Sequence, residues 1–146
     1  MDNITLQIAD FSITVAVPYL GPINAHSLLD QGFVQLQTST NADPFLYTVE
    51  YFGYSQSGFG YLGYELESIN SEKNGTNDYY WSLAINGAAA SVGMDSVWLN
   101  PGDVASWTYV SYASVKTSAM RDRITELNRR RGQRQTLRQA RKPIVP

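Results

Sequence analysis

Apolar and polar residues alternate at the start of the chain, where residues 4–17 read ITLQIADFSITVAV. The alternation is broken near Ala9 and Asp10. A period of two is typical of a strand with one buried face, so this segment predicts either one long bent strand or a hairpin of two short strands. The residues PYLGP at 18–22 then have the composition of a turn.

The period of the pattern then changes to that of a helix. Asn24 is a favourable N-cap residue, and the apolar positions that follow fit one helix face: Ala25, Leu28, Leu29 and Leu36. Because Gly32 weakens the middle of this pattern, we predict a short helix over about 25–31. The single histidine, His26, lies just inside this helix, and we interpret it as a partly exposed helix residue.

Strand patterns return after the polar residues 38–44. Large side chains on both faces of FLYTVEYF (45–52) predict a central strand. Alternation over 64–69 predicts a further strand, and KNGTND (73–78) predicts a turn because Asn-Gly accepts a positive φ. The clearest strand patterns are YYWSLAI (79–85) and VASWTYVSY (104–112), which we expect to close a small sheet with Trp81 and Trp107 in the core.

Near the end of the chain, the apolar positions are again spaced as in a helix, among Arg, Gln and Glu: Val115, Met120, Ile124, Leu127 and Leu137. Gly132 interrupts this pattern and Pro143 ends it. The order of elements predicts an α+β fold: a β-grasp-like mixed sheet with one packed helix, followed by a basic C-terminal helical tail. We place the domain at residues 1–112 and the basic helix or tail at residues 113–146.

Charge divides the chain into two parts. Residues 1–120 hold eleven acidic and two basic side chains, a net charge of −9, whereas residues 121–146 hold nine basic and two acidic ones, a net charge of +7. Such an asymmetry indicates an interaction arm. The basic residues that we expect to contact a partner are Arg121, Arg123, Arg129, Arg130, Arg131, Arg134, Arg138, Arg141 and Lys142.

The side chains that most catalytic and metal sites use are scarce. With no cysteine and one histidine, the chain has no disulfide framework and no zinc site of the usual thiolate or imidazole kind. Glu65 and Glu67 would lie about 7 Å apart on one strand face, where an exposed acidic face explains them as well as acid–base catalysis does. We find no Ca²⁺-binding loop and no phosphate-binding glycine loop in the sequence. We therefore expect no catalytic residues, no metal site and no cofactor.

Three segments carry a resemblance to a known family: GYLGYELESIN (60–70), YYWSLAINGAAASVGM (79–94) and WLNPGDVASWTY (98–109). In the order of their turns and aromatic residues they resemble the C-terminal β-grasp domain of transcobalamin and intrinsic factor, and we extend the resemblance over residues 4–112. The resemblance implies a β-grasp fold. It also implies contact with a cobalamin-like ligand through Tyr80, Trp81, Asn86, Gly87, Ala88, Ser91 and Gly93.

Our leading hypothesis is a non-enzymatic structural or interaction module. In this interpretation a β-grasp domain is displayed at a surface and anchored in a larger assembly, such as a filament, a virion or a cell-surface layer, by its Arg-rich C-terminal helix. The expected partners are other protein chains, with a homo-oligomer favoured. Two alternatives stay open: a small-ligand, cobalamin-like carrier domain, and a nucleic-acid-associated protein that binds through the basic tail.

Signals for location are few. No run of residues approaches the ~18–20 apolar residues of a membrane span, and the start, MDNITLQIADF, lacks the features of a secretory signal. The tripeptides at Asn3 and Asn74 fit the N-glycosylation sequon and mildly favour secretion. An extracellular surface or a virion or filament assembly is therefore the favoured location.

Overall fold

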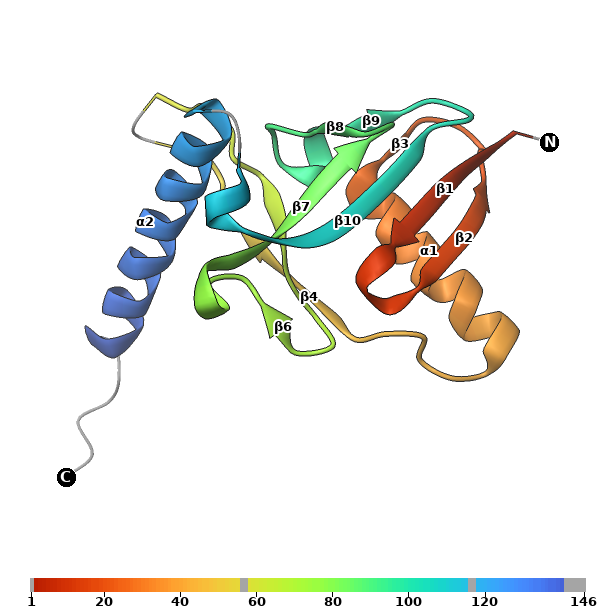
Figure 1. Cartoon of the computed structure of the whole chain (residues 1–146), viewed down its shortest axis with the longest axis horizontal. Helices are drawn as coiled ribbons and strands as arrows, with labels where there is room; N and C mark the ends of the chain where they lie inside the picture. Colours follow the sequence, from red (N-terminus) through yellow and green to blue (C-terminus); the bar gives the residue numbers. More distant parts are fainter. Residues whose placement is uncertain (1, 56–57, 116–117, 141–146) are drawn as a thin grey trace. The chain divides into compact units, whose positions relative to one another are not determined.

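The computed structural model describes residues 2–55, 58–115 and 118–140 (Figure 1). The chain falls into two compact units, Met1–Ser114 and Val115–Pro146. Among the described residues, the first unit holds all the strands and the helix α1 (Ala25–Thr40), and the second unit holds the helix α2 (Ser118–Ala140). The strands are β1 (Asn3–Ile8), β2 (Ile13–Pro18), β3 (Ile23–Asn24), β4 (Tyr47–Tyr51), β5 (Tyr64–Ile69), β6 (Glu72–Lys73), β7 (Tyr79–Ile85), β8 (Ala88–Ala89), β9 (Trp98–Leu99) and β10 (Val104–Ser111).

A five-stranded mixed sheet forms the body of the first unit, in the order β2-β1-β10-β7-β8. β1 and β2 form an antiparallel hairpin, which was one of the two predictions for residues 4–17. β10 lies between β1 and β7 in this sheet. It pairs in parallel with β1 and antiparallel with β7. The sheet is therefore mixed, and the predicted α+β class is confirmed.

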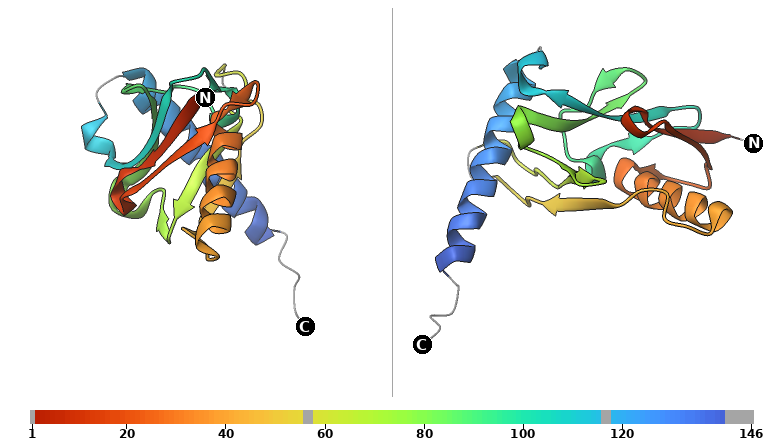
Figure 2. Two further views of the ribbon diagram at one scale, coloured as in Figure 1. Left: turned by 90° about the vertical axis from the view of Figure 1, so that its right-hand side faces the viewer. Right: turned by 60° about the horizontal axis from the view of Figure 1, so that its bottom comes forward.

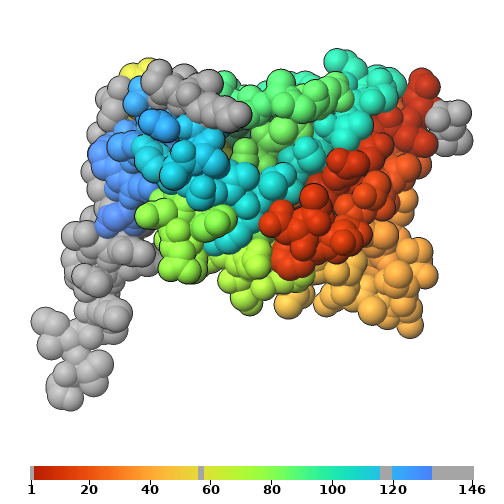
Figure 3. All heavy atoms as spheres, in the orientation of Figure 1, coloured from red at the N-terminus to blue at the C-terminus, as the bar shows by residue number. Residues whose placement is uncertain are grey.

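The core lies between this sheet and α1, which runs along one side of the sheet (Figure 2). The strands alternate as the sequence pattern predicts: Leu6, Ile8 and Val15 are buried, while Thr14 and Ala16 are exposed. Trp107 is 1% exposed, so its predicted place in the core is confirmed. The space-filling view shows that β1 and β10 themselves form part of the surface on the other side of the sheet (Figure 3).

The first helix is longer than its sequence pattern predicts. Asn24 is its N-cap, as predicted, and its side chain accepts a hydrogen bond of 2.8 Å from the Ser27 N–H. The predicted end near residue 31 is wrong, because α1 continues through Gly32 to Thr40. A Cβ at Gly32 would lie 2.4 Å from Leu6 Cδ2. The glycine is thus a point of close approach between helix and sheet, which compensates for its low helix propensity.

A second, three-stranded sheet has the order β4-β5-β6. The predicted strands over 45–52 and 64–69 are present, but the central position predicted for the first is wrong, because β4 lies at an edge. Large side chains on both faces misled the prediction. Tyr47 and Val49 pack against the core, and Glu50 and Phe52 are also buried, so both faces are covered without a second neighbouring strand. β3 and β9 form a separate two-stranded ladder.

The described part of the second unit contains α2, which spans Ser118–Ala140. The helix runs through Gly132, since one glycine costs only about 1 kcal/mol relative to alanine in a helix. Pro143, predicted to end this helix, lies outside the described residues. Neither of the described helices is both long enough and apolar enough to cross a membrane.

Candidate functional site

Trp81, one of the predicted ligand residues, is part of the core. Its side chain is 9% exposed, and its ring lies 5.0 Å from the ring of Tyr109. The indole N–H donates to the Glu72 carbonyl at 2.8 Å, and the backbone N–H donates to the Asn74 side chain at 2.8 Å. The Asn74 amide nitrogen in turn donates to the Leu66 carbonyl at 2.6 Å. The amide that the sequon would glycosylate is therefore already a structural bridge between β5 and β7.

The turn predicted at Asn86-Gly87 is confirmed. Asn86 has φ 52° and Gly87 has φ 85°, and the turn joins β7 to the short strand β8. The Asn86 side chain also fixes the start of β10: its Nδ2 donates to Asp103 Oδ1 at 2.9 Å, and its Oδ1 accepts from the Val104 N–H at 2.9 Å. Both polar atoms of this side chain are thus used inside the fold.

Gly93 is buried beside Asp95, which connects its own loop to the segment that leads into β5. Asp95 accepts from the Tyr61 hydroxyl at 2.6 Å and from the Tyr64 N–H at 2.8 Å. A Cβ at Gly93 would lie 2.5 Å from the Leu62 carbonyl oxygen and 2.9 Å from Asp95 Oδ1. Sequence reasoning missed Asp95, since a single Asp in a loop has no distinctive pattern. The one related feature of the sequence is Gly93, two positions earlier, where an added side chain would collide with Asp95.

The predicted ligand residues do not meet in one place. Trp81 lies near the start of β7 and Asn86 just after its end, five residues and roughly 16 Å further along the extended strand. Tyr80 lies next to Trp81, with its ring 6.3 Å from the ring of Tyr112. Ala88 and Ser91 are exposed, in β8 and in the loop after it. The set therefore consists of a core residue, a turn and a packing glycine rather than a pocket.

A row of aromatic rings crosses β4 and β5. Consecutive ring centroids lie 5.0 Å apart for Tyr54 and Tyr61, 6.4 Å for Tyr61 and Tyr51, 4.6 Å for Tyr51 and Tyr64, and 4.8 Å for Tyr64 and His26. The hydrogen bond to Asp95 raises the pKa of Tyr61 above its ordinary value, and burial adds to this effect. Tyr61 therefore stays a protonated donor rather than a base.

Asp30 makes a second polar cluster, on α1. It accepts a hydrogen bond from the Tyr47 hydroxyl, and its Oδ2 lies 3.8 Å from His26 Nε2. Burial raises the pKa of Tyr47, and the hydrogen bond and the negative charge of Asp30 raise it further. His26 is partly exposed on this helix, as predicted. In the part of the chain that the structure describes, no three His, Asp or Glu side chains are grouped so as to hold a metal ion.

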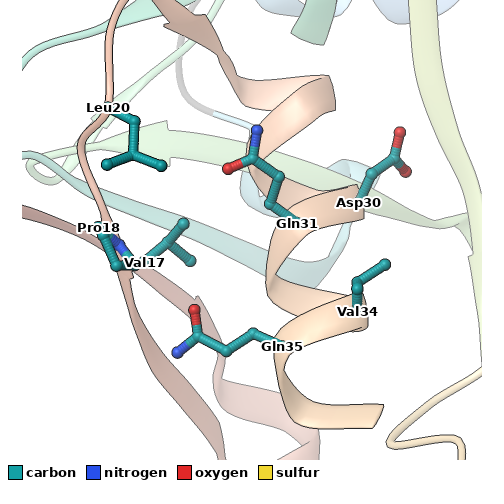
Figure 4. Close-up of a pocket in the computed structure, with 7 residues that line it drawn as sticks. All are labelled: Val17, Pro18, Leu20, Asp30, Gln31, Val34 and Gln35. Carbon is teal, nitrogen blue, oxygen red and sulfur yellow. The ribbon is translucent and has the colours of Figure 1, made fainter. Parts of the chain in front are cut away.

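An open groove of about 370 Å³ runs between β2 and α1 (Figure 4). Val17, Pro18 and Leu20 line it from the strand side, and Asp30, Gln31, Val34 and Gln35 line it from the helix. Leu20 is 89% exposed and Val34 is 55% exposed. The Gln35 side chain reaches across and donates to the Ala16 carbonyl at 2.9 Å. Sequence reasoning missed this groove, since its two walls come from different elements.

Residues 47–111 match a family described as a domain of unknown function (DUF4430). Among solved structures, a protein from Ruminococcus gnavus described as a proposed metal-binding protein is similar, with 14% sequence identity and a TM-score of 0.44. The match covers 76% of this chain and 98% of that one. No curated protein matches the chain. The finer resemblance to the transcobalamin domain stays a prediction.

The family match covers only part of the structure. It begins with β4 and ends with β10, so it includes the four tyrosines of the aromatic row and Asp95, but not His26. The β1–β2 hairpin, α1 and α2 lie outside it. The groove, which is lined by residues of β2 and α1 and by Leu20, therefore also lies outside the matched segment.

The predicted partner-binding residues of α2 are described only in part. Arg129 forms a two-pronged hydrogen bond with Glu126, from Nε at 3.1 Å and from Nη2 at 2.6 Å, which raises the pKa of the guanidinium. Arg131 donates to Asn128 at 2.7 Å, and Arg121 donates to the Val115 carbonyl at 2.8 Å. The side chains of Arg134 and Arg138, and the residues Arg141 and Lys142, lie outside the described part of the chain.

Proposed function

We propose that this chain is a non-enzymatic assembly module, in which the first unit is an acidic interaction domain and α2 is a basic arm that joins it to other copies. The observation that supports this proposal is the position of the charge boundary, which coincides with the boundary between the two compact units. The first unit holds eleven acidic side chains and Lys73, a net charge of −10. The second holds ten basic and two acidic side chains, a net charge of +8.

Opposite charges on two units of one chain favour association between copies. A body at −10 repels another body, and an arm at +8 repels another arm, so the favourable encounter is arm with body. Such an arrangement is heterologous: each copy uses one surface to bind and a different surface to be bound. Attraction between exposed charges is screened as salt rises, because the Debye length falls from about 10 Å at 0.1 M to about 3 Å at 1 M.

The negative charge of the first unit also bears on the two alternatives, nucleic-acid binding and small-ligand binding. A polyanion such as DNA or RNA would be attracted to the positive charge of α2 but repelled by the negative charge of the first unit of the same chain. The small-ligand alternative relies on Tyr80, Trp81 and the loop from Asn86 to Gly93. Of these residues, Trp81 is used in the core, Asn86 in a turn and Gly93 in close packing. The acidic domain instead favours a cationic protein partner, and the chain carries one in its own second unit.

Light scattering after size exclusion tests this proposal on the full chain. We expect association at 50 mM NaCl, weakening steeply by 500 mM. A variant with Arg130, Arg131, Arg134 and Arg138 replaced by Gln is expected to be monomeric at both salt concentrations. The matched control replaces the same four residues by Lys, which keeps the charge and should keep the association. A full chain that is monomeric at every salt concentration, or a Gln variant that associates normally, would contradict the proposal.

A further inference from the structure

The groove between β2 and α1 has the geometry of a site for an extended peptide. One wall is β2, which lies at the edge of the five-stranded sheet, and the other is a helix. Figure 4 shows the Gln31 and Gln35 side chains extending from the helix on the side of the groove, with Val17, Pro18 and Leu20 on the opposite wall. An edge strand offers backbone N–H and C=O groups to a new strand, and side-chain pockets beside it supply specificity.

The backbone of β2 is engaged in a way that imitates such a neighbour. Ala16 is paired on one side with Thr5 of β1. Its carbonyl accepts a hydrogen bond of 2.9 Å from the Gln35 side-chain amide. A primary amide N–H at this position is a chemical stand-in for the backbone N–H of an added strand. Because the Gln35 contact is exposed, exchanging one amide donor for another changes the energy of the Ala16 carbonyl little.

The chemistry of the groove limits what it would bind. Its exposed walls are aliphatic, with Leu20 89% exposed and Val34 55% exposed, and its one charged lining residue is Asp30. Lys73 is the only lysine or arginine in the first unit, whose net charge is −10. The fitting ligand is therefore an extended peptide with aliphatic side chains and flanking positive charges.

Residues 141–146 form a segment of this chemistry. Residues 141–146 read RKPIVP, with two cations followed by the aliphatic pair Ile144 and Val145. Pro143 and Pro146 disfavour helical backbone at the residues before them, so this sequence is suited to an extended conformation. Ile144 and Val145 retain N–H groups, either of which would replace the Gln35 amide at the Ala16 carbonyl.

We propose that the groove binds residues 141–146 of a second copy of the chain. This inference rests on the proposed function and adds a docking site to it. The tail belongs to the second unit and the groove to the first, so each bound copy still offers a free tail or a free groove to the next. Association is then head-to-tail, and it forms an open chain of copies unless the geometry closes a ring.

Peptide binding tests the groove independently of assembly. The labelled peptide RKPIVP is titrated, with anisotropy as the readout, into a chain that ends at Ala140 and so keeps every described residue. Leu20→Asp and Val34→Asp are each expected to weaken binding at least about tenfold, the ratio that corresponds to losing the burial of one aliphatic side chain. An added carboxylate would by itself attract this cationic peptide, so weaker binding identifies the apolar contact.

The matched control is Leu46→Asp, which adds the same charge at a leucine that is 64% exposed and does not line the groove. It is expected to leave the affinity unchanged. A peptide in which Ile144 and Val145 are replaced by Asp is expected not to bind. Equal affinities for the Leu20, Val34 and Leu46 variants would overturn the proposal. Circular dichroism confirms folding, which these exposed positions should not disturb.

Complementation in the full chain tests the head-to-tail arrangement. A chain with Leu20→Asp has an intact tail, and a chain with Ile144→Asp and Val145→Asp has an intact groove. Each alone is expected to be monomeric, and their mixture to give a heterodimer that grows no further. If both variants associate like the wild type while the Gln variant of α2 does not, the proposed function stands, and the proposed docking of the tail in the groove is wrong. If the peptide binds the groove but the full chain is monomeric, the groove is a peptide-binding site, and both the docking between copies and the proposed function fail.

Discussion

Replacing Gly93 by alanine tests the interpretation that this residue is a packing position rather than a ligand contact. The backbone at Gly93 has φ −58° and ψ 151°, which alanine adopts without strain. The added Cβ would lie 2.5 Å from the Leu62 carbonyl oxygen, 2.9 Å from Asp95 Oδ1 and 3.1 Å from the Tyr64 backbone nitrogen. Two of these three atoms are backbone, so they cannot move aside as the end of a flexible side chain would.

The expected loss of stability follows from these contacts. Separating Asp95 from the Tyr64 N–H removes a hydrogen bond to a charged group, which contributes about 1.5–3 kcal/mol. Forcing a methyl group into a filled site costs a further ~1–3 kcal/mol. Alanine also lowers the conformational entropy of the unfolded chain, which offsets about 0.4–1 kcal/mol of this loss. Because the two costs partly overlap, we expect Gly93→Ala to lower the free energy of unfolding by about 2–4 kcal/mol.

Urea unfolding followed by tryptophan fluorescence measures this loss, because Trp81 and Trp107 are both in the core. With a slope of about 2 kcal/mol per M, the midpoint should fall by roughly 1–2 M. Gly132→Ala is the control: nothing lies within 4 Å of its added Cβ, and alanine is the better helix former, so stability should not fall. A Gly93→Ala midpoint within about 0.3 M of the wild type, at an unchanged slope, would refute the packing argument.

Two further predictions concern Tyr47, Tyr61 and Asn86. Folding raises the pKa of Tyr47 and of Tyr61 above the ordinary value near 10. The contribution of these two hydroxyl groups to stability is therefore complete below pH 10. It is lost as the pH rises further, because the tyrosines ionise first in the unfolded chain. Tyr47→Phe and Tyr61→Phe should each make the decline in unfolding free energy above pH 10 shallower in urea titrations, and an unchanged decline would count against the shifts. Asn86→Ala removes two hydrogen bonds and places alanine at φ 52°, so we expect a loss of about 1–3 kcal/mol by the same assay. A loss equal to that of an exposed substitution such as Leu46→Ala would show that the turn is not fixed by this side chain.

Local pattern was enough to identify most elements of the first unit. The hairpin at 4–17, the N-cap at Asn24, the strands at 79–85 and 104–111 and the turn at Asn86 all follow from residues close together in the sequence. The predicted end of α1 and the predicted central position of β4 were wrong for a shared reason. Both depend on what packs against the element: at Gly32 it is Leu6, and at β4 it is the core beneath Tyr47 and Val49.

The candidate sites were harder to predict than the elements. The resemblance directed attention to Trp81, Asn86 and Gly93, whose patterns are distinctive because each has a structural task. Asp95 carried no pattern, although it joins Tyr61 and Tyr64. The walls of the groove, at Leu20 and Val34, are fourteen positions apart, and they had no common pattern that would connect them.

The sequence by itself determined the α+β class, the alternation that buries one face of the main sheet, and the division of charge between an acidic domain and a basic helix. These are properties of composition and of short-range order, which the chain carries whether or not it is folded. Only the tertiary structure decided which strands are edges, where a helix approaches a sheet closely at a glycine, and that β2 and α1 form a groove. Those features arise from contacts between distant segments, and the energy of such contacts depends on a geometry that no single stretch of residues specifies.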